Sequence, residues 1–110
     1  MSKEKRIGKL RRRLQLESPV EAADEIGGFS RTWTNVASVW GEIETLSGED
    51  TFEASQGQIQ LTHRVTVRWR PDITGAMRLR DGARAFEIIA ALDGDAQRRF
   101  LVCRCREIKP

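Results

Sequence analysis

"IQLTHRVTVRWR", residues 59–70, is the stretch that decides the fold class. Its side chains alternate between two faces, and a period of two is typical of a β-strand with one buried side. The apolar face consists of Leu61, His63, Val65, Val67 and Trp69, and the polar face of Thr62, Arg64, Thr66, Arg68 and Arg70. Because His63 lies on the apolar face, we interpret it as a core histidine satisfied by its neighbours and not as a catalyst.

Further strands are predicted on both sides of this one. "LRRRLQLE" (10–17) alternates leucines with basic and polar residues, and "SRTWTNVASVWGEIETL" (30–46) is rich in Thr, Val and Trp, with a break expected near Asn35. Between them, "SPVEAADEIGGFS" (18–30) carries Pro19 and Gly27-Gly28 and is predicted to be a loop or turn.

The later part of the chain continues in the same way. Asp81-Gly82 predicts a hairpin with a type I′ turn, and "RRFLVCRCREI" (98–108) predicts the closing strand. There is no βαβ rhythm. The pattern therefore predicts a mainly β fold, a small antiparallel β-barrel or sandwich of about six strands, with Gly41, Ile43, Val65, Val67, Phe86 and Ile88 in the barrel.

A helix is predicted in one place only. "LSGEDTFEASQGQIQ" (46–60) is too long for a tight hairpin, and Ser47 followed by Asp50 is an S-x-x-D helix-start signal. Gly57 is a natural helix stop. We therefore predict a short helix at about 48–56, in a loop that contains Glu49, Asp50 and Glu53 and no basic residue.

The charge of the chain is unevenly distributed. The net charge is +3 over 110 residues, but residues 1–20 hold seven basic and two acidic side chains, residues 21–58 one and eight, and residues 59–110 eleven and six. Such segregation gives opposite faces that suit head-to-tail contact between copies, unless folding mixes the segments into a mottled surface. We expect residues 1–9 to form a flexible basic arm and residues 10–110 a single β-barrel-like domain.

Several function classes are disfavoured. No run of residues is long and apolar enough to span a bilayer, and no signal peptide is visible, so we expect a soluble cytosolic protein with no membrane contact. The sequence lacks G-x-S-x-G, H-E-x-x-H, P-loop and G-x-G-x-x-G motifs. Cys103 and Cys105 are expected to be reduced thiols, and with His63 they lack a fourth metal ligand. We expect no enzyme activity, metal or cofactor.

Two other classes are open. A basic arm and the row of Arg64, Arg68 and Arg70 on a small β-barrel are compatible with sequence-independent nucleic-acid binding, although Trp69 faces away from the row. The same arginines are compatible with an assembly protein, in which an acidic element of one copy contacts the basic face of the next.

The order of motifs is similar to that of a known family. "RIGKLRRRLQLESP" (6–19), "DEIGGFSRTWTNVASVWGEIETLSGEDTFEASQ" (24–56) and "THRVTVRWRPDITGAMRLRDGARAFEII" (62–89) together resemble the phage head–tail joining proteins, also called head–tail adaptor, head-closure or stopper proteins. The resemblance extends from Arg6 to about Cys105. The late cysteines depart from the family pattern.

The resemblance implies a virion protein with a mechanical role at the head–tail interface of a tailed phage, a prophage or a gene transfer agent, made in the bacterial cytoplasm. Copies would form a ring below the portal and adaptor, with the tail terminator or tail tube below, around a channel through which DNA passes without sequence-specific contacts. The loop at 46–58 would line the channel or the subunit interface, with Ser47, Glu49, Asp50, Thr51, Phe52 and Glu53. Contacts with the adaptor ring or an adjacent subunit would come from the arm, with Lys5, Arg6, Lys9, Arg11 and Arg13.

Overall fold

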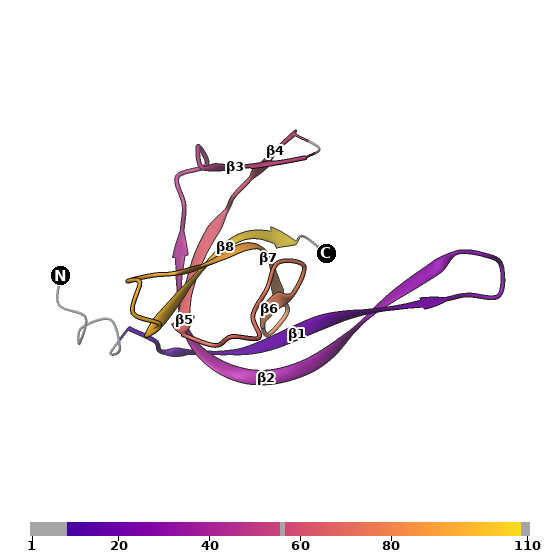
Figure 1. Ribbon diagram of the computed structural model, residues 1–110, viewed down its shortest axis with the longest axis horizontal. Coiled ribbons are helices and arrows are strands. Elements are labelled where there is room, and N and C mark those ends of the chain that lie inside the picture. The colour runs from indigo at the N-terminus through magenta and orange to yellow at the C-terminus, as the bar shows by residue number, and fades with distance from the viewer. Residues whose placement is uncertain (1–8, 56, 109–110) are drawn as a thin grey trace.

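All the regular secondary structure in the described part of the chain is β-strand. The computed structural model describes residues 9–55 and 57–108, and this part contains eight strands and no helix (Figure 1). The strands are β1 (Arg12–Ala23), β2 (Phe29–Thr45), β3 (Thr51–Ala54), β4 (Gly57–Gln60), β5 (His63–Arg68), β6 (Arg78–Asp81), β7 (Arg84–Asp93) and β8 (Phe100–Ile108).

Six of these strands form a closed antiparallel barrel in the order β1-β2-β5-β8-β7-β6. The barrel closes because β1 also pairs with β6, from Gln15 opposite Arg80 to Glu17 opposite Arg78. Of the two architectures that the sequence left open, the barrel is the one observed. Closure pairs every barrel strand on both sides over at least part of its length, so the wall leaves little strand edge to which another copy could add a strand.

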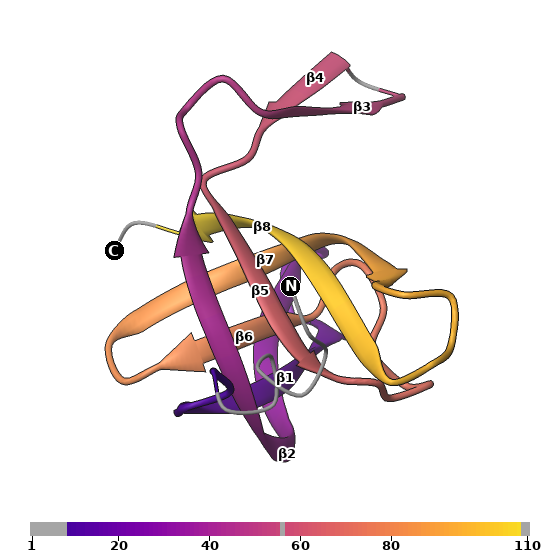
Figure 2. The same cartoon turned by 90° about the vertical axis from the view of Figure 1, so that its left-hand side faces the viewer.

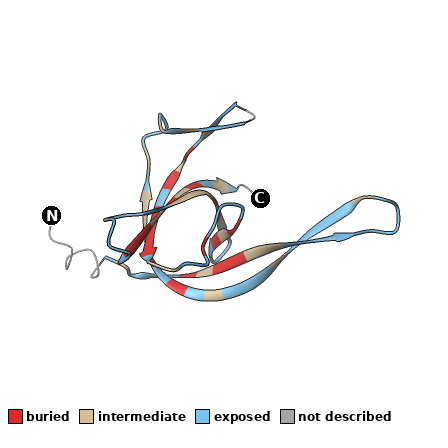
Figure 3. Ribbon diagram, viewed as in Figure 1, coloured by how far each residue is buried: buried red, intermediate tan, exposed pale blue. Residues whose placement is uncertain are grey.

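The interior is filled by the apolar residues that alternation predicted. Val65, Val67, Phe86 and Ile88 are fully buried, and Ile43 packs against this core. Figure 3 shows that the buried segments lie in the barrel and not in its projections. His63 is a core residue as predicted: it is 5% exposed, and its Nδ1 lies 2.8 Å from the Thr62 hydroxyl.

Gly41 is required where β2 crosses the core. A Cβ there would lie 2.9 Å from Leu14 Cδ1 and 3.2 Å from the Thr66 carbonyl oxygen, and a backbone atom cannot move aside cheaply.

Two hairpins project from the barrel (Figures 1 and 2). The first is the outer half of β1 and β2, which from here on we call the arm (residues 18–34); the basic arm predicted at residues 1–9 lies, apart from Lys9, outside the described residues. Its predicted loop character was wrong from Ser18 to Ala23, which continue β1 and pair with β2 as far as Ala23 opposite Phe29. Pro19 is tolerated because β1 has only one neighbouring strand there.

Instead of a break near Asn35, the structure has a β-bulge: Leu16 pairs with Ala37, Glu17 with Asn35, and Val36 is the extra residue.

The second projection is the β3–β4 hairpin, and here the predicted helix at 48–56 was wrong. Phe52 pairs with Ile59 and Thr51 with Gln60 in a two-stranded sheet. The helix-start residues serve a turn instead, since the Ser47 hydroxyl accepts a 3.4 Å hydrogen bond from the Glu49 amide and Gly48 has a φ of 94°. Capping side chains satisfy backbone groups equally well in turns and at helix starts, so the local signal was ambiguous.

The β6–β7 hairpin was predicted correctly, but its turn type was not. Asp81 pairs with Arg84, so the two loop residues are Gly82 and Ala83. Only Gly82 has a positive φ, 62°, which is the pattern of a type II′ turn, whereas type I′ needs two such residues.

Candidate assembly surfaces

The β3–β4 hairpin holds all six residues predicted to line a channel or subunit interface. Ser47, Glu49 and Asp50 lie in the connection before β3, and the remaining three lie in β3 itself. The hairpin is closed at its base, where the Leu46 amide donates to the Thr62 carbonyl and the Leu61 amide to the Asp50 carbonyl, both at 2.9 Å. None of its described residues from 46 to 60 is buried, so it stands away from the barrel wall (Figure 2).

This hairpin is an acidic surface. Glu49 and Glu53 are exposed, and Asp50 is half-buried. None of the three carboxylates forms an ion pair with another residue of the described part of the chain. Phe52 is half-buried between them and faces Ile59. The hairpin therefore offers uncompensated negative charge around a small apolar centre.

The predicted basic row is largely neutralised by partners that the sequence did not indicate. Arg64 pairs with Glu44 at 3.3 Å on the adjacent strand. Arg70 donates two hydrogen bonds to Asp72, at 3.0 and 2.8 Å, and these bonds hold the pKa of the Asp72 carboxyl below its ordinary value. Within the described residues, only Arg68 of the row has no ion-pair partner. The three arginines do not make one continuous basic face.

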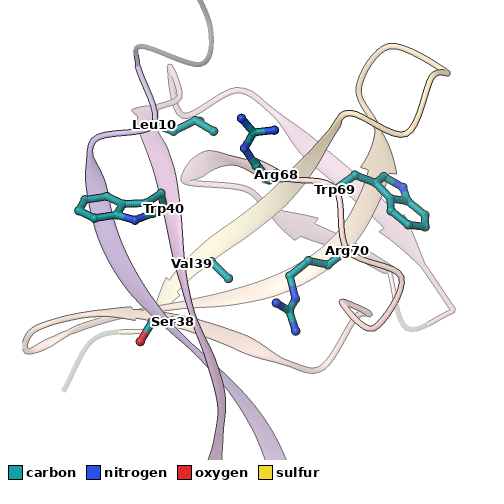
Figure 4. A pocket seen from close by; sticks show the side chains of 7 residues that line it. All are labelled: Leu10, Ser38, Val39, Trp40, Arg68, Trp69 and Arg70. Atoms are coloured by element: carbon teal, nitrogen blue, oxygen red, sulfur yellow. The ribbon is translucent and has the colours of Figure 1, made fainter.

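Arg68 and Arg70 instead contribute to a cavity of about 630 Å³, which we call the Trp40 pocket (Figure 4). It lies between the start of β1, the middle of β2 and the end of β5, and it is lined by Leu10, Ser38, Val39, Trp40, Arg68, Trp69 and Arg70. Trp40 is 54% exposed, so it does not belong to the core. Strict alternation of side chains between two faces holds only within a strand. Because β5 ends at Arg68, the prediction that Trp69 faces away from the arginines does not extend to Trp69 and Arg70, and all three residues line the pocket.

The described part of the predicted N-terminal contact region borders this pocket. Arg13 pairs in register with Trp40, and the Arg11 amide donates to the Lys9 carbonyl at 2.9 Å. Lys5 and Arg6 lie outside the described residues. Of these basic residues, Arg13 thus lies beside the exposed indole of Trp40.

Sequence reasoning missed a further surface, the tip of the arm. Ile26 is 92% exposed and Phe29 is 75% exposed, which is unusual for large apolar side chains. The available signal was "EIGGF" (25–29), in which two apolar residues flank a turn-forming glycine pair. Together the two side chains form a small exposed apolar patch at the end of the arm.

Two kinds of site are missing from the part of the chain that the structure describes. No group of three or more His, Cys, Asp or Glu side chains there is placed to hold a metal ion. No helix there is long and apolar enough to cross a membrane.

The chain matches the family model of the phage head completion protein over residues 5–108, which is nearly its whole length. It belongs to the phage head completion protein family. This is a family of structural proteins and not of enzymes. The family match supports the resemblance that the motif order indicated.

Solved structures agree with the fold of this head completion protein. One is a chain from the virion of a native gene transfer agent particle, with 29% identity and a TM-score of 0.65 over 89% of this chain and 94% of that one. Another is the solution structure of protein SF1141 from Shigella flexneri 2a, with 27% identity and a TM-score of 0.63 over 90% and 95% of the two chains. No curated protein matches this head completion protein.

Proposed function

We propose that this protein completes the head of a phage-like particle by forming a ring below the portal and adaptor, around the channel through which DNA passes, with the tail docking below. Its family membership and its similarity to a gene transfer agent virion protein support this proposal. The observation that carries it is architectural: a closed barrel has little strand edge to share, and two hairpins project from it. Contacts between copies then depend on the projecting elements, and head-to-tail contacts of that kind close into rings.

The β3–β4 hairpin is the element that we assign to the channel. Its three carboxylates, which form no ion pair within the described residues, would repel DNA phosphates, so passing DNA would not adhere to the ring. The basic residues leading into β1, Lys5, Arg6, Lys9, Arg11 and Arg13, are assigned to the adaptor ring above or to an adjacent subunit. Electrostatic contacts of this kind mainly fix orientation and speed up association.

Deletion of the gene tests the proposed role directly. Electron microscopy of particles from a producer strain without the gene should show filled or leaking heads beside separate, finished tails. Normal tailed particles from that strain would exclude an essential joining role.

Charge reversal tests the assignment of the β3–β4 hairpin. The triple variant Glu49→Lys, Asp50→Lys, Glu53→Lys should fold, because these side chains are not buried, but should reduce the yield of completed particles. The matched control is the amide variant Glu49→Gln, Asp50→Asn, Glu53→Gln, which removes the repulsion without adding attraction and should give an intermediate yield. Wild-type yield from the lysine variant would refute the channel assignment.

One observation favours a second candidate, sequence-independent nucleic-acid binding. The Trp40 pocket combines an exposed indole with Arg68 and Arg70, which is the combination that single-strand binding sites use. Titration of the purified protein with single-stranded DNA over a salt series distinguishes the two functions. Tight binding with a steep salt dependence would favour the nucleic-acid function.

A further inference from the structure

The tip of the arm is a rigid, acidic-apolar knob. The Asp24 carboxylate accepts hydrogen bonds from the Ile26 amide at 3.0 Å and the Gly28 amide at 2.8 Å, and the Asp24 amide donates to the Gly28 carbonyl at 2.9 Å. Gly27 takes the positive φ, 83°, that the turn requires. A turn fixed in this way loses little conformational entropy when it binds a partner.

The side chains of this knob are neither buried nor ion-paired by other described residues of their own chain. Ile26 and Phe29 are the two most exposed large apolar side chains in the described part of the protein. Beside them, Glu25 is exposed and forms no ion pair within the described residues. A surface complementary to the knob would therefore be apolar and positively charged.

The Trp40 pocket has this complementary character. Leu10 and Val39 give it an apolar lining, Trp40 and Trp69 lie at its opposite sides (Figure 4), and its volume of about 630 Å³ lies within the range of roughly 300–1,000 Å³ that binding clefts span. Arg68 lies at the pocket without an ion-pair partner in the described residues, and Arg13 is the cross-strand neighbour of Trp40. The pocket can thus receive apolar side chains and a carboxylate together.

The placement of the two surfaces excludes contact within one molecule. The protein measures 54 × 30 × 26 Å, and the arm tip lies at one end of the long dimension, while the start of β1 and the end of β5, which border the pocket, lie at the other (Figure 1). Since knob and pocket are different surfaces at opposite ends, their contact is head-to-tail and can be repeated around a ring.

We infer that the arm tip of one copy, Ile26 and Phe29 with Glu25, inserts into the Trp40 pocket of the next copy and is the contact that links neighbours. This inference rests on the proposed ring and names its subunit interface. It assigns the β3–β4 hairpin no role in that interface, so the two projections have separate functions.

Cysteine cross-linking within particles tests the contact and its direction. A chain with Ile26→Cys and Ser38→Cys, one residue on the knob and one in the pocket, should give a ladder of covalent multimers when completed particles are oxidised. The native Cys103 and Cys105 are fully buried and do not compete. Each single variant should give no covalent multimers, and a mixture of the two single variants should give covalent dimers and nothing larger. Dimers from Ile26→Cys alone would indicate tip-to-tip contact, and completed particles without a ladder would likewise overturn the inference.

A charge exchange tests the same contact without relying on disulfide geometry. Glu25→Arg and Arg68→Glu should each reduce the yield of completed particles about tenfold, the change expected when a contact worth about 1.4 kcal/mol is lost. The double variant should recover most of that yield because the pair is restored with its signs exchanged. Full yield from both single variants, or no recovery in the double variant, would contradict the inference.

Two comparisons separate this inference from its alternatives. If gene deletion leaves normal tailed particles, the proposed function fails, whereas a joining defect on deletion combined with normal particles from the exchange variants defeats only the interface. Oligothymidylate added to the purified wild-type chain should leave its tryptophan fluorescence unchanged. Saturable quenching that Arg68→Glu abolishes would assign the pocket to nucleic acid and overturn its assignment to the arm tip.

Discussion

At the residue scale, Gly82 shows how one backbone angle sets a hairpin. Its φ of 62° lies in the region that β-branched residues avoid, and open space surrounds the position where a Cβ would be. Gly82→Val should therefore destabilise the protein through backbone strain alone, by about 1–3 kcal/mol. Thermal unfolding measures this as a lower Tm. Gly82→Asn is the control, because Asn tolerates a positive φ and should lower the Tm much less; equal losses in both variants would refute the turn geometry.

The two cysteines give a second prediction at this scale. Burial raises the pKa of the Cys103 thiol from 9.0 to about 12 and raises that of Cys105 as well. The neutral thiols should therefore resist a thiol reagent at pH 8 in the native protein and react once urea unfolds it. Rapid native labelling at either position would contradict the buried placement.

The sign of the linked pH dependence follows from the same shifts. A folded pKa above the unfolded value means that the contribution to stability is complete below pH 9.0 and is lost as the pH rises toward 12. The free energy of unfolding should therefore fall with rising pH in this window. The variant Cys103→Ala, Cys105→Ala should show a smaller fall, and equal slopes in both proteins would contradict the assignment to the thiols.

At the element scale, the root of the arm depends on a buried carboxylate. Glu17 is 6% exposed and accepts from Arg78 Nε at 2.6 Å, where the pairing of β1 with β6 ends. The same guanidinium lies 4.1 Å from the centre of the Trp33 ring, so it connects the barrel to the arm.

Glu17→Gln should therefore lower the free energy of unfolding by about 1–3 kcal/mol, because the Arg78 guanidinium loses its charged partner and keeps only a neutral acceptor. Hydrogen exchange should also accelerate across the arm, residues 18–34. The matched control is Glu21→Gln, which removes an exposed ion pair with Arg31 at 2.8 Å and should cost about 0–1 kcal/mol. Similar effects from both variants would show that Glu17 has no special place at the root.

Elements with one buried face were the ones predictable from sequence. Alternation located β5 because Val65 and Val67 face the core, and it located the start of β1 because Leu14 and Leu16 do. The arm and the β3–β4 hairpin bury neither face, so they carry no such alternation. Their signals, Pro19 and Ser47 with Asp50, are local and are equally compatible with loops, turns and helix starts.

The candidate surfaces divide in a similar way. The acidic stretch at Glu49–Glu53 was visible because charge along the chain is read directly from the sequence. Neutralisation of Arg64 by Glu44 was not visible, because it depends on the pairing of β2 with β5. The Trp40 pocket requires three segments to meet, and the sequence does not state which segments do so.

At the scale of the whole molecule, the protein divides into a barrel that supplies stability and projections that do not. No residue from 18 to 36 is buried, so the arm contributes nothing to the core (Figure 3). Elements that cost conformational entropy and bury nothing in the monomer are explained if they bury surface in an assembly. This division predicts that folding and assembly can be separated by a single change.

Replacing residues 19–33 with Asn-Gly is that change, since Ser18 and Thr34 are cross-strand partners and Asn-Gly forms a two-residue hairpin turn. The shortened chain should keep its circular dichroism spectrum and unfold cooperatively, with a Tm only slightly lowered by loss of the contact between Trp33 and Arg78. In a producer strain it should fail to complete particles, although the β3–β4 hairpin is intact. Completed particles at wild-type yield would show that the arm is dispensable for assembly. An unfolded product would show instead that the barrel depends on the arm.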